Sequence, residues 1–250
     1  MVALCYLAAI VGAEALGLIA GVGVGGLSQA LLVLVLLNHC ILRERSTSRP
    51  LLLVLALIPL SRVLGLAVPM RYLPPIYWYA AAGVPLFIAV ALVARALGIP
   101  VRSLASMPKL AYAFGPPQML FALSGLPLSL LAFAIGRPKP IEIASGIELI
   151  LAVIILLAMV GALEEITYRG MLQDRATELF GRQGLLYVNA LFAAMHFGSL
   201  SWLYVPFIAL VGLLYSWWVW RTGTVSGVAL SHGLLSIGAI VLWPMVWPSG

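Results

Sequence analysis

Five side chains in the second half of the chain have the types and the spacing that proton-transfer chemistry needs. Glu164 and Glu165 are adjacent, Arg169 follows four residues after Glu165, and His196 and His232 come later. Carboxylates and imidazoles are the groups that most often act as general acids and bases in enzymes. These residues are therefore the candidates for a catalytic or proton-carrying site.

The two adjacent glutamates are predicted to differ in their partners. On a helix, Glu165 and Arg169 lie one turn apart with the acid nearer the N-terminus, which is the favourable order for a helical ion pair. Glu164 is turned by about 100° from Glu165 and is left without that partner. An unpaired carboxylate in a partly dry site suits a general base.

The composition identifies the solvent that surrounds these residues. Of the 250 residues, 63% are hydrophobic and 9% are charged, and the mean hydropathy is +1.12. So few charges cannot cover a water-facing surface, which excludes a soluble enzyme, a secreted disulfide scaffold and a disordered linker. The net charge of +6 follows the bias of membrane proteins towards basic cytoplasmic loops, so no nucleic-acid partner is expected.

Glycine, proline and charge clusters divide the chain into apolar stretches, each of about the 20 residues that a spanning helix needs. The predicted fold class is all-α, a polytopic transmembrane helix bundle with about nine spanning helices, and eight remain possible. The predicted stretches are 2–22, 26–42, 51–68, 76–97, 111–135, 147–169 with a possible extension to 180, 184–199, 202–220 and 224–246.

We expect one integral membrane domain in two parts. Residues 1–146 would hold helices 1–5, and residues 147–250 would hold the catalytic helices 6–9.

The basic residues predict an orientation in the membrane. Loops on one side of the nine predicted helices would hold Arg43, Arg45, Arg49, Arg95, Arg102, Lys109, Arg169, Arg175, Arg182 and Arg221. The opposite side, or the helices themselves, would hold only Arg62, Arg71, Arg137 and Lys139. The first side is therefore expected to be cytoplasmic, with the N-terminus inside. The expected location is a prokaryotic cell membrane, crossed many times.

Helix geometry predicts that the acid and both imidazoles converge inside the bilayer. If the sixth helix runs unbroken to the turn at Gly181, Glu164 lies roughly 27 Å from that turn and His196, on the returning helix, roughly 21 Å. His232 lies roughly 14 Å beyond the turn at Gly223, which helix tilt can accommodate.

Two further charges, Glu14 and Arg62, fall within predicted spans. Both would lie roughly 18 Å deep, because each is about 12 residues into a helix that starts on the inner side. We interpret them as a buried ion pair that ties the first helix to the third; the alternative is the wall of a solvated cavity.

The motifs on the late helices resemble those of a known family. Glu-Glu-x-x-x-Arg at Glu164, Phe-x-x-x-His ending at His196 and His-x-x-x-polar from His232 to Ser236, in this order, look like the CaaX-protease and bacteriocin-processing family (CPBP, also called ABI) of glutamate intramembrane proteases. The likeness covers residues 150–236, and residues 1–146 match only as hydrophobic helices.

The resemblance implies an intramembrane endopeptidase with no cofactor. It implies that Glu164 is the general base, that His196 holds or activates the water, and that His232 and position 236 stabilise the oxyanion, while Glu165 and Arg169 shape the site. The family's last motif usually ends in Asn or Asp, whereas this chain has Ser236. A hydroxyl at this position still donates one hydrogen bond to an oxyanion.

Rival proteolytic mechanisms are excluded by missing motifs. The chain has a single aspartate, Asp174, and no Gly-x-Ser-Gly, so two-aspartate and rhomboid-like intramembrane proteases are excluded, and without a His-Glu-x-x-His motif a zinc intramembrane protease of that type is not expected. A metal ion held by Glu164, Glu165, His196 and His232 remains an alternative that is not favoured, because Glu165 is expected to pair with Arg169.

Two hypotheses from other classes remain beside the peptidase. The same acid and imidazoles could form a proton relay in a transporter, or the chain could be an inert relative that serves as a membrane scaffold or chaperone. The expected partners are the lipid bilayer and a peptide or protein substrate at or within it. A prenylated tail, a bacteriocin leader and a C-terminal sorting segment are the alternative substrates that suit a site within the bilayer.

Overall fold

The chain folds into helices throughout the part that a computed structural model describes, which is residues 2–44, 46–69, 72–99, 115–138, 141, 143–198 and 201–247. No strand occurs among these residues, and the predicted all-helical membrane bundle is confirmed. Long apolar runs form helices here because a helix satisfies every internal backbone hydrogen bond within its own segment, as lipid requires.

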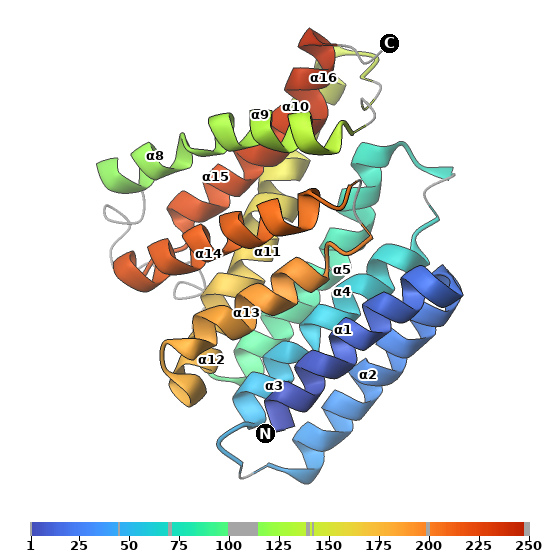
Figure 1. Ribbon diagram of the computed structural model, residues 1–250, viewed down its shortest axis with the longest axis vertical. Helices are drawn as coiled ribbons and strands as arrows, with labels where there is room; N and C mark the ends of the chain where they lie inside the picture. The colour runs from blue at the N-terminus through green and yellow to red at the C-terminus, as the bar shows by residue number, and fades with distance from the viewer. Residues whose placement is uncertain are drawn as a thin grey trace.

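The first part of the chain forms two antiparallel pairs of helices. α1 and α2 pack against each other, α2 also packs against α4, and α4 packs against α5 (Figure 1). The elements are α1 (Val2–Ala20), α2 (Val22–Leu42), α3 (Arg49–Leu55), α4 (Leu57–Ala67) and α5 (Pro75–Ala96). α3 and α4 together make one apolar stretch, Arg49–Ala67.

The second part of the chain is built around α15. This helix packs against η2, α8 and α9, and α13 pairs with α14 (Figure 1). The elements are α8 (Pro116–Ala122), α9 (Gly125–Gly136), α10 (Gly146–Ile155), η2 (Leu156–Ala162), α11 (Leu163–Glu165), η3 (Ile166–Leu172), α12 (Gln173–Phe180), α13 (Gln183–Ala194), α14 (Tyr204–Thr222), α15 (Ser226–Ile237), η4 (Gly238–Leu242) and α16 (Trp243–Val246).

Seven helical stretches within the described residues are long and apolar enough to cross a membrane. They correspond to seven of the nine predicted stretches, and the sixth runs without a break over Gly146–Phe180, as its possible extension predicted. The other two predicted stretches are also helices. α13 has 12 residues, while α14 has 19 but carries three tryptophans and Arg221, which lower its hydropathy.

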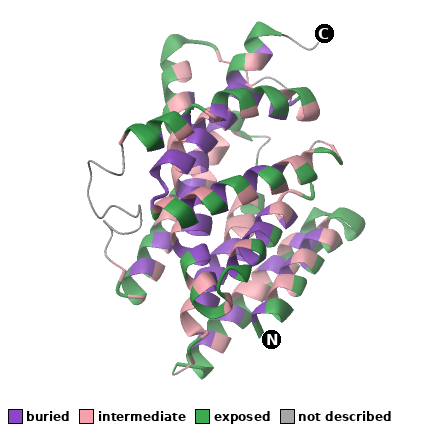
Figure 2. Cartoon of the chain, turned by 60° about the vertical axis from the view of Figure 1, so that its left-hand side comes forward, coloured by how far each residue is buried: buried purple, intermediate pink, exposed green. Residues whose placement is uncertain are grey.

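The position of each helix in the bundle matches the character of its surface. Half of the apolar window of Ser226–Val246 is buried, against 22% for α1 and for α2. The exposed faces of α1 and α2 are apolar, with Leu18, Ile19 and Leu27 among their exposed side chains. Figure 2 shows exposed positions on the outer faces and buried positions towards the middle of the bundle. Apolar outer faces are what lipid-facing helices require.

Several sequence predictions fall on residues outside the described ranges. They are the start of the fifth helix at 111 and the basic residues Arg45, Arg71, Arg102, Lys109 and Lys139. The N-terminal orientation and the division at residue 146 stay predictions. Contacts cross that division, since α10 and η2 pack against α5, and α1 packs against α13.

Candidate active site

Glu164 and Glu165 lie in the middle of the 35-residue helix Gly146–Phe180. A short α-helical turn, α11, carries both acids and is flanked by the π-helical segments η2 and η3. π-helical turns inside a helix often occur at functional sites, because the extra residue per turn redirects side chains. The sequence predicted a regular α-helix over this stretch, so the π-helical turns of η2 and η3 depart from that prediction.

Glu165, Arg169 and His232 form a sealed group, here named the C-terminal charge cluster. The Arg169 Nη1 donates to Oε1 of Glu165 at 3.2 Å, and both side chains are 0% exposed. The His232 Nδ1 lies 2.8 Å from the same oxygen. The predicted Glu165–Arg169 pair is confirmed, and His232 is a second partner of Glu165 that the spacing did not predict.

Glycines allow the C-terminal charge cluster to close. A Cβ atom at Gly161 would lie 3.0 Å from the Cα of Gly233, so the long helix and α15 meet backbone to backbone just beside His232. At Gly212, the missing side chain lets Arg169 approach α14, where its Nη2 donates to the Gly212 carbonyl oxygen at 3.3 Å. Arg169 also lies 4.1 Å above the ring centroid of Phe192.

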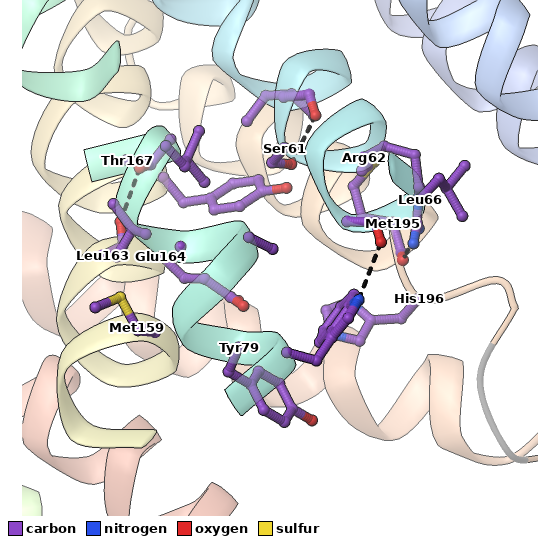
Figure 3. Close-up of a pocket in the computed structure, with 17 residues that line it drawn as sticks. Ser61, Arg62, Leu66, Tyr79, Met159, Leu163, Glu164, Thr167, Met195 and His196 are labelled. Carbon is purple, nitrogen blue, oxygen red and sulfur yellow. Dashed lines mark hydrogen bonds between the residues drawn. The ribbon is translucent and has the colours of Figure 1, made fainter. Parts of the chain in front are cut away.

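Glu164 faces a different environment, a cavity of about 340 Å³ between α4, α5, the long helix and the end of α13. His196 lines the same cavity. Figure 3 shows the Glu164 carboxylate directed across the cavity, with His196, Met195 and Arg62 on the facing side. Glu164 forms no hydrogen bond or ion pair with another described residue, as predicted for the unpaired member of the two acids.

His196 lies just beyond the end of its helix. α13 ends at Ala194, whereas the sequence predicted helix to 199, a position outside the described residues. In a continuing α-helix the His196 backbone N–H would donate to the Phe192 carbonyl oxygen. Here the His196 Nδ1 bonds to that oxygen at 2.8 Å, and the backbone N–H donates to the Ala193 carbonyl oxygen, so the α-helix ends. A carbonyl only accepts, so Nδ1 carries the proton, and a neutral His196 has Nε2 as an acceptor.

A second charged group, here named the N-terminal charge cluster, consists of Glu14, Gln29 and Arg62. The Arg62 Nε and Nη2 donate to the two carboxylate oxygens of Glu14 at 2.8 and 2.7 Å, and Gln29 donates to Glu14 at 2.7 Å. The predicted ion pair between the first and third helices is confirmed. Arg62 also lines the cavity, so the alternative prediction of a cavity wall holds for this residue as well.

Sequence reasoning did not select two tyrosines, Tyr79 and Tyr168, that line the cavity with Glu164. Tyr168 follows Glu164 by four residues and therefore shares its helix face, a spacing that was available from the sequence. The hydroxyl groups of Tyr79 and Tyr168 form no hydrogen bond within the described part of the chain. They are free to contact a ligand in the cavity.

Ser236 lies one turn after His232 on α15 and is partly buried. Neither Ser236 nor His232 is among the residues that line the Glu164 cavity. The structure thus divides five of the predicted site residues into two sets on different sides of the helical turn that carries both acids: Glu164 lies with His196 from the end of α13, and Glu165 and Arg169 lie with His232 from α15. No three His, Cys, Asp or Glu side chains of the described residues are grouped as metal ligands would be.

The part of the chain that contains Glu164, His196 and His232 is similar to a known protein family. Residues 146–238 match the family described as type II CAAX prenyl endopeptidase Rce1-like. This range begins with the long helix and ends just after Ser236, and it agrees with the family resemblance that the motifs predicted. Neither the curated proteins nor the solved structures include a significant match to the chain.

Proposed function

We propose, on the premise that residues 146–238 belong to the Rce1-like family, that this protein is an intramembrane endopeptidase in which Glu164 activates the attacking water. The description of this family, CAAX prenyl endopeptidase, supports a membrane protease of the CAAX type as the general class of activity. The observation that carries the mechanism is the contrast between the two acids. Glu165 is bonded to Arg169 and to His232, whereas Glu164 has no such partner among the described residues and shares a cavity with His196.

Glu164 and His196 are suited to hold one water molecule together. A water has two protons to donate, and the Glu164 carboxylate and the His196 Nε2 are both acceptors. A water that donates to both would keep a lone pair directed at a substrate carbonyl carbon. Glu164 would then take a proton as the oxygen attacks, and would return it to the leaving amine.

The C-terminal charge cluster would serve the developing oxyanion through His232, the member of the cluster that is 8% exposed and lies close enough to Glu164 to act on it electrostatically. A doubly protonated His232 donates from Nδ1 to Glu165 and has Nε2–H left for the oxyanion, and the Glu165 carboxylate stabilises that imidazolium. Ser236 would offer one hydroxyl donor in place of the amide or acid usual in the family. Arg169 would hold Glu165 in position from the other side.

The substrate would be a peptide presented at or within the bilayer. The cavity walls are membrane helices, with Leu66, Leu86 and Met159 among their apolar side chains. A lipid-modified or membrane-anchored peptide fits such walls, because its apolar part would not have to leave the membrane to reach Glu164.

The decisive experiment replaces Glu164 by Gln, which removes the base and keeps the size of the side chain. Purified variants in proteoliposomes are given peptides that end in a CAAX sequence, with and without a prenyl group, and new termini are identified by mass spectrometry. Glu164→Gln is expected to lower kcat by about 10² to 10⁴, the usual contribution of a general base, with thermal unfolding unchanged. Glu178→Gln, on an exposed acid of α12, is the matched control and should cleave like the wild type.

Other results would contradict the proposal. Full activity in a folded Glu164→Gln protein would exclude Glu164 as the base. Loss of activity with a chelator, restored by a metal ion, would replace metal-independent water activation by metal chemistry. Proton-coupled uptake with no cleaved product would favour the transport hypothesis instead.

A further inference from the structure

Arg62 makes a contact that its role as an ion-pair partner does not require. Besides the two hydrogen bonds to Glu14, its Nη2 donates to the backbone carbonyl oxygen of Met195. Met195 immediately precedes His196 in the chain. The N-terminal charge cluster therefore touches the backbone that carries the cavity histidine, although Arg62 and Met195 are 133 residues apart in sequence.

The end of α13 is a place where such a contact has an effect. The last carbonyl groups of a helix lack intrahelical partners and carry partial negative charge, so a cation that donates to them stabilises that end. Met195 is the residue that directly follows the last helical residue, Ala194. A guanidinium bonded to its carbonyl oxygen fixes the direction in which the chain leaves the helix, and with it the starting point of the His196 side chain.

Arg62 is itself held rigidly enough to act in this way. Two nitrogens of the planar guanidinium are bonded to two oxygens of one carboxylate, which fixes the plane of the group. Gln29, which is 0% exposed, donates to Oε1 of Glu14, the oxygen that also accepts from the Arg62 Nε. The contacts form a continuous series from Gln29 through Glu14 and Arg62 to the residue before His196.

We infer that Arg62 is a positioning residue for His196, held in place by Glu14 and Gln29. Arg62 caps the C-terminal end of α13 and thereby aims the imidazole into the cavity opposite Glu164. This inference rests on the proposed function, because it gives the N-terminal helices a part in placing the catalytic water. Without the guanidinium, His196 would keep its bond to Phe192 but lose its fixed position relative to Glu164.

A purely structural role for Arg62 makes a different prediction. A pair that only ties α1 to α4 can be replaced by any stable contact between these helices without effect on catalysis. Removing both members of a buried ion pair often leaves stability unchanged, so the two roles can be separated.

The first variant is therefore Glu14→Gln/Arg62→Met. The new amide oxygen at position 14 can still accept from Gln29, and the new thioether side chain at position 62 fills much of the volume of the arginine. We expect thermal unfolding close to the wild type, kcat lower by about a hundredfold, the usual cost of a misplaced catalytic group, and KM within about twofold. A folded double variant with wild-type kcat would overturn the inference.

The exchange variant Glu14→Arg/Arg62→Glu provides a second test in case the first does not fold. The exchange restores an ion pair, but the carboxylate at position 62 cannot donate to the Met195 carbonyl oxygen. We expect unfolding to recover relative to the single charge reversals while kcat stays low. Recovery of both stability and kcat would show that the pair is only a tie.

A spectroscopic measurement distinguishes failure of this inference from failure of the proposed function. The chain has three histidines, so ring-labelled protein gives three imidazole signals, and His196→Gln assigns one of them. In Glu14→Gln/Arg62→Met, the His196 signal should shift or split while the His232 signal stays in place. An unchanged His196 signal overturns the inference. A changed signal in a protein that cleaves nothing retains the positioning role and contradicts only the peptidase.

Discussion

The two charge clusters differ in how far their side chains are exposed to the cavity. The C-terminal cluster is closed, since Glu165 and Arg169 are 0% exposed and His232, which bonds to Glu165, is 8% exposed. The N-terminal cluster is open on one side, since the Arg62 side chain is 30% exposed and lines the cavity. Both clusters pair an acid with an arginine, yet only the open one also contacts the backbone next to a cavity residue.

The contrast shows how Glu164 can remain unpaired inside a membrane protein. An isolated buried carboxylate is costly, so arginines close to it would normally pair with it. Here Arg169 is held by Glu165 and Arg62 by Glu14, while both remain close enough to act on Glu164 electrostatically. Each cluster therefore keeps its arginine away from the acid that we propose as the base.

Among the substitutions that test this comparison, one that removes the ion pair of the C-terminal cluster is expected to lower the free energy of unfolding the most. Glu165→Gln leaves the buried charge of Arg169 without a counter-charge, and breaking a buried pair in this way costs about 3–5 kcal/mol. The free energy of unfolding, measured in mixed micelles, should fall by that amount. Glu164→Gln is the control on the neighbouring residue and should leave it unchanged. Equal losses in the two variants would mean that the acids are not divided between a structural and a chemical role.

A smaller effect is expected from separating the helices that close the C-terminal cluster. The three atoms nearest to a Cβ atom at Gly161 would be backbone atoms of α15, including the Ala229 carbonyl oxygen, so the helices must move apart. Gly161→Ala should therefore lower the free energy of unfolding by about 1–3 kcal/mol, as overpacking usually does. The resulting movement would lengthen the His232–Glu165 hydrogen bond.

Gly12→Ala is the matched control for that substitution. Nothing lies within 4 Å of a Cβ atom at Gly12 on α1, and alanine is the better helix former, so stability should rise slightly. If Gly161→Ala behaves like Gly12→Ala, the close approach of the long helix to α15 does not hold the cluster together.

Local features of the molecule were predictable from the sequence. The apolar runs located the helices because membrane spans need about 20 apolar residues. The spacing of four between Glu165 and Arg169 predicted their pair, and counting residues from the membrane surface predicted that Glu14 meets Arg62. Each of these predictions needs only the length, rise and turn of single helices, counted from the membrane surface where two helices are compared.

Features that depend on how helices approach each other were not predictable in the same way. The His232–Glu165 bond depends on the contact between Gly161 and Gly233, and no spacing within either helix indicates that contact. At the end of α13, the His196 side chain bonds back to Phe192 and Arg62 from another helix donates to the Met195 carbonyl oxygen, and the apolar pattern that predicted the helix indicates neither contact. Tyr168 could have been selected as a site residue from the sequence, because it lies four residues after Glu164, but its place in the cavity wall depends on how the helices pack.

The smallest expected effect concerns a third arginine, which belongs to neither cluster. Arg175 on α12 bonds to Asp174 at 2.7 Å and to Glu178 at 2.8 Å, but these acids are 56% and 54% exposed. Water competes for such charges, and an exposed pair contributes about 0–1 kcal/mol. Arg175→Gln should therefore change the free energy of unfolding by less than about 1 kcal/mol, and the difference should shrink further in high salt. A loss as large as that of Glu165→Gln would mean that burial is not what separates the clusters from ordinary ion pairs, because Arg175 has acid partners at similar distances that differ mainly in their own exposure to solvent.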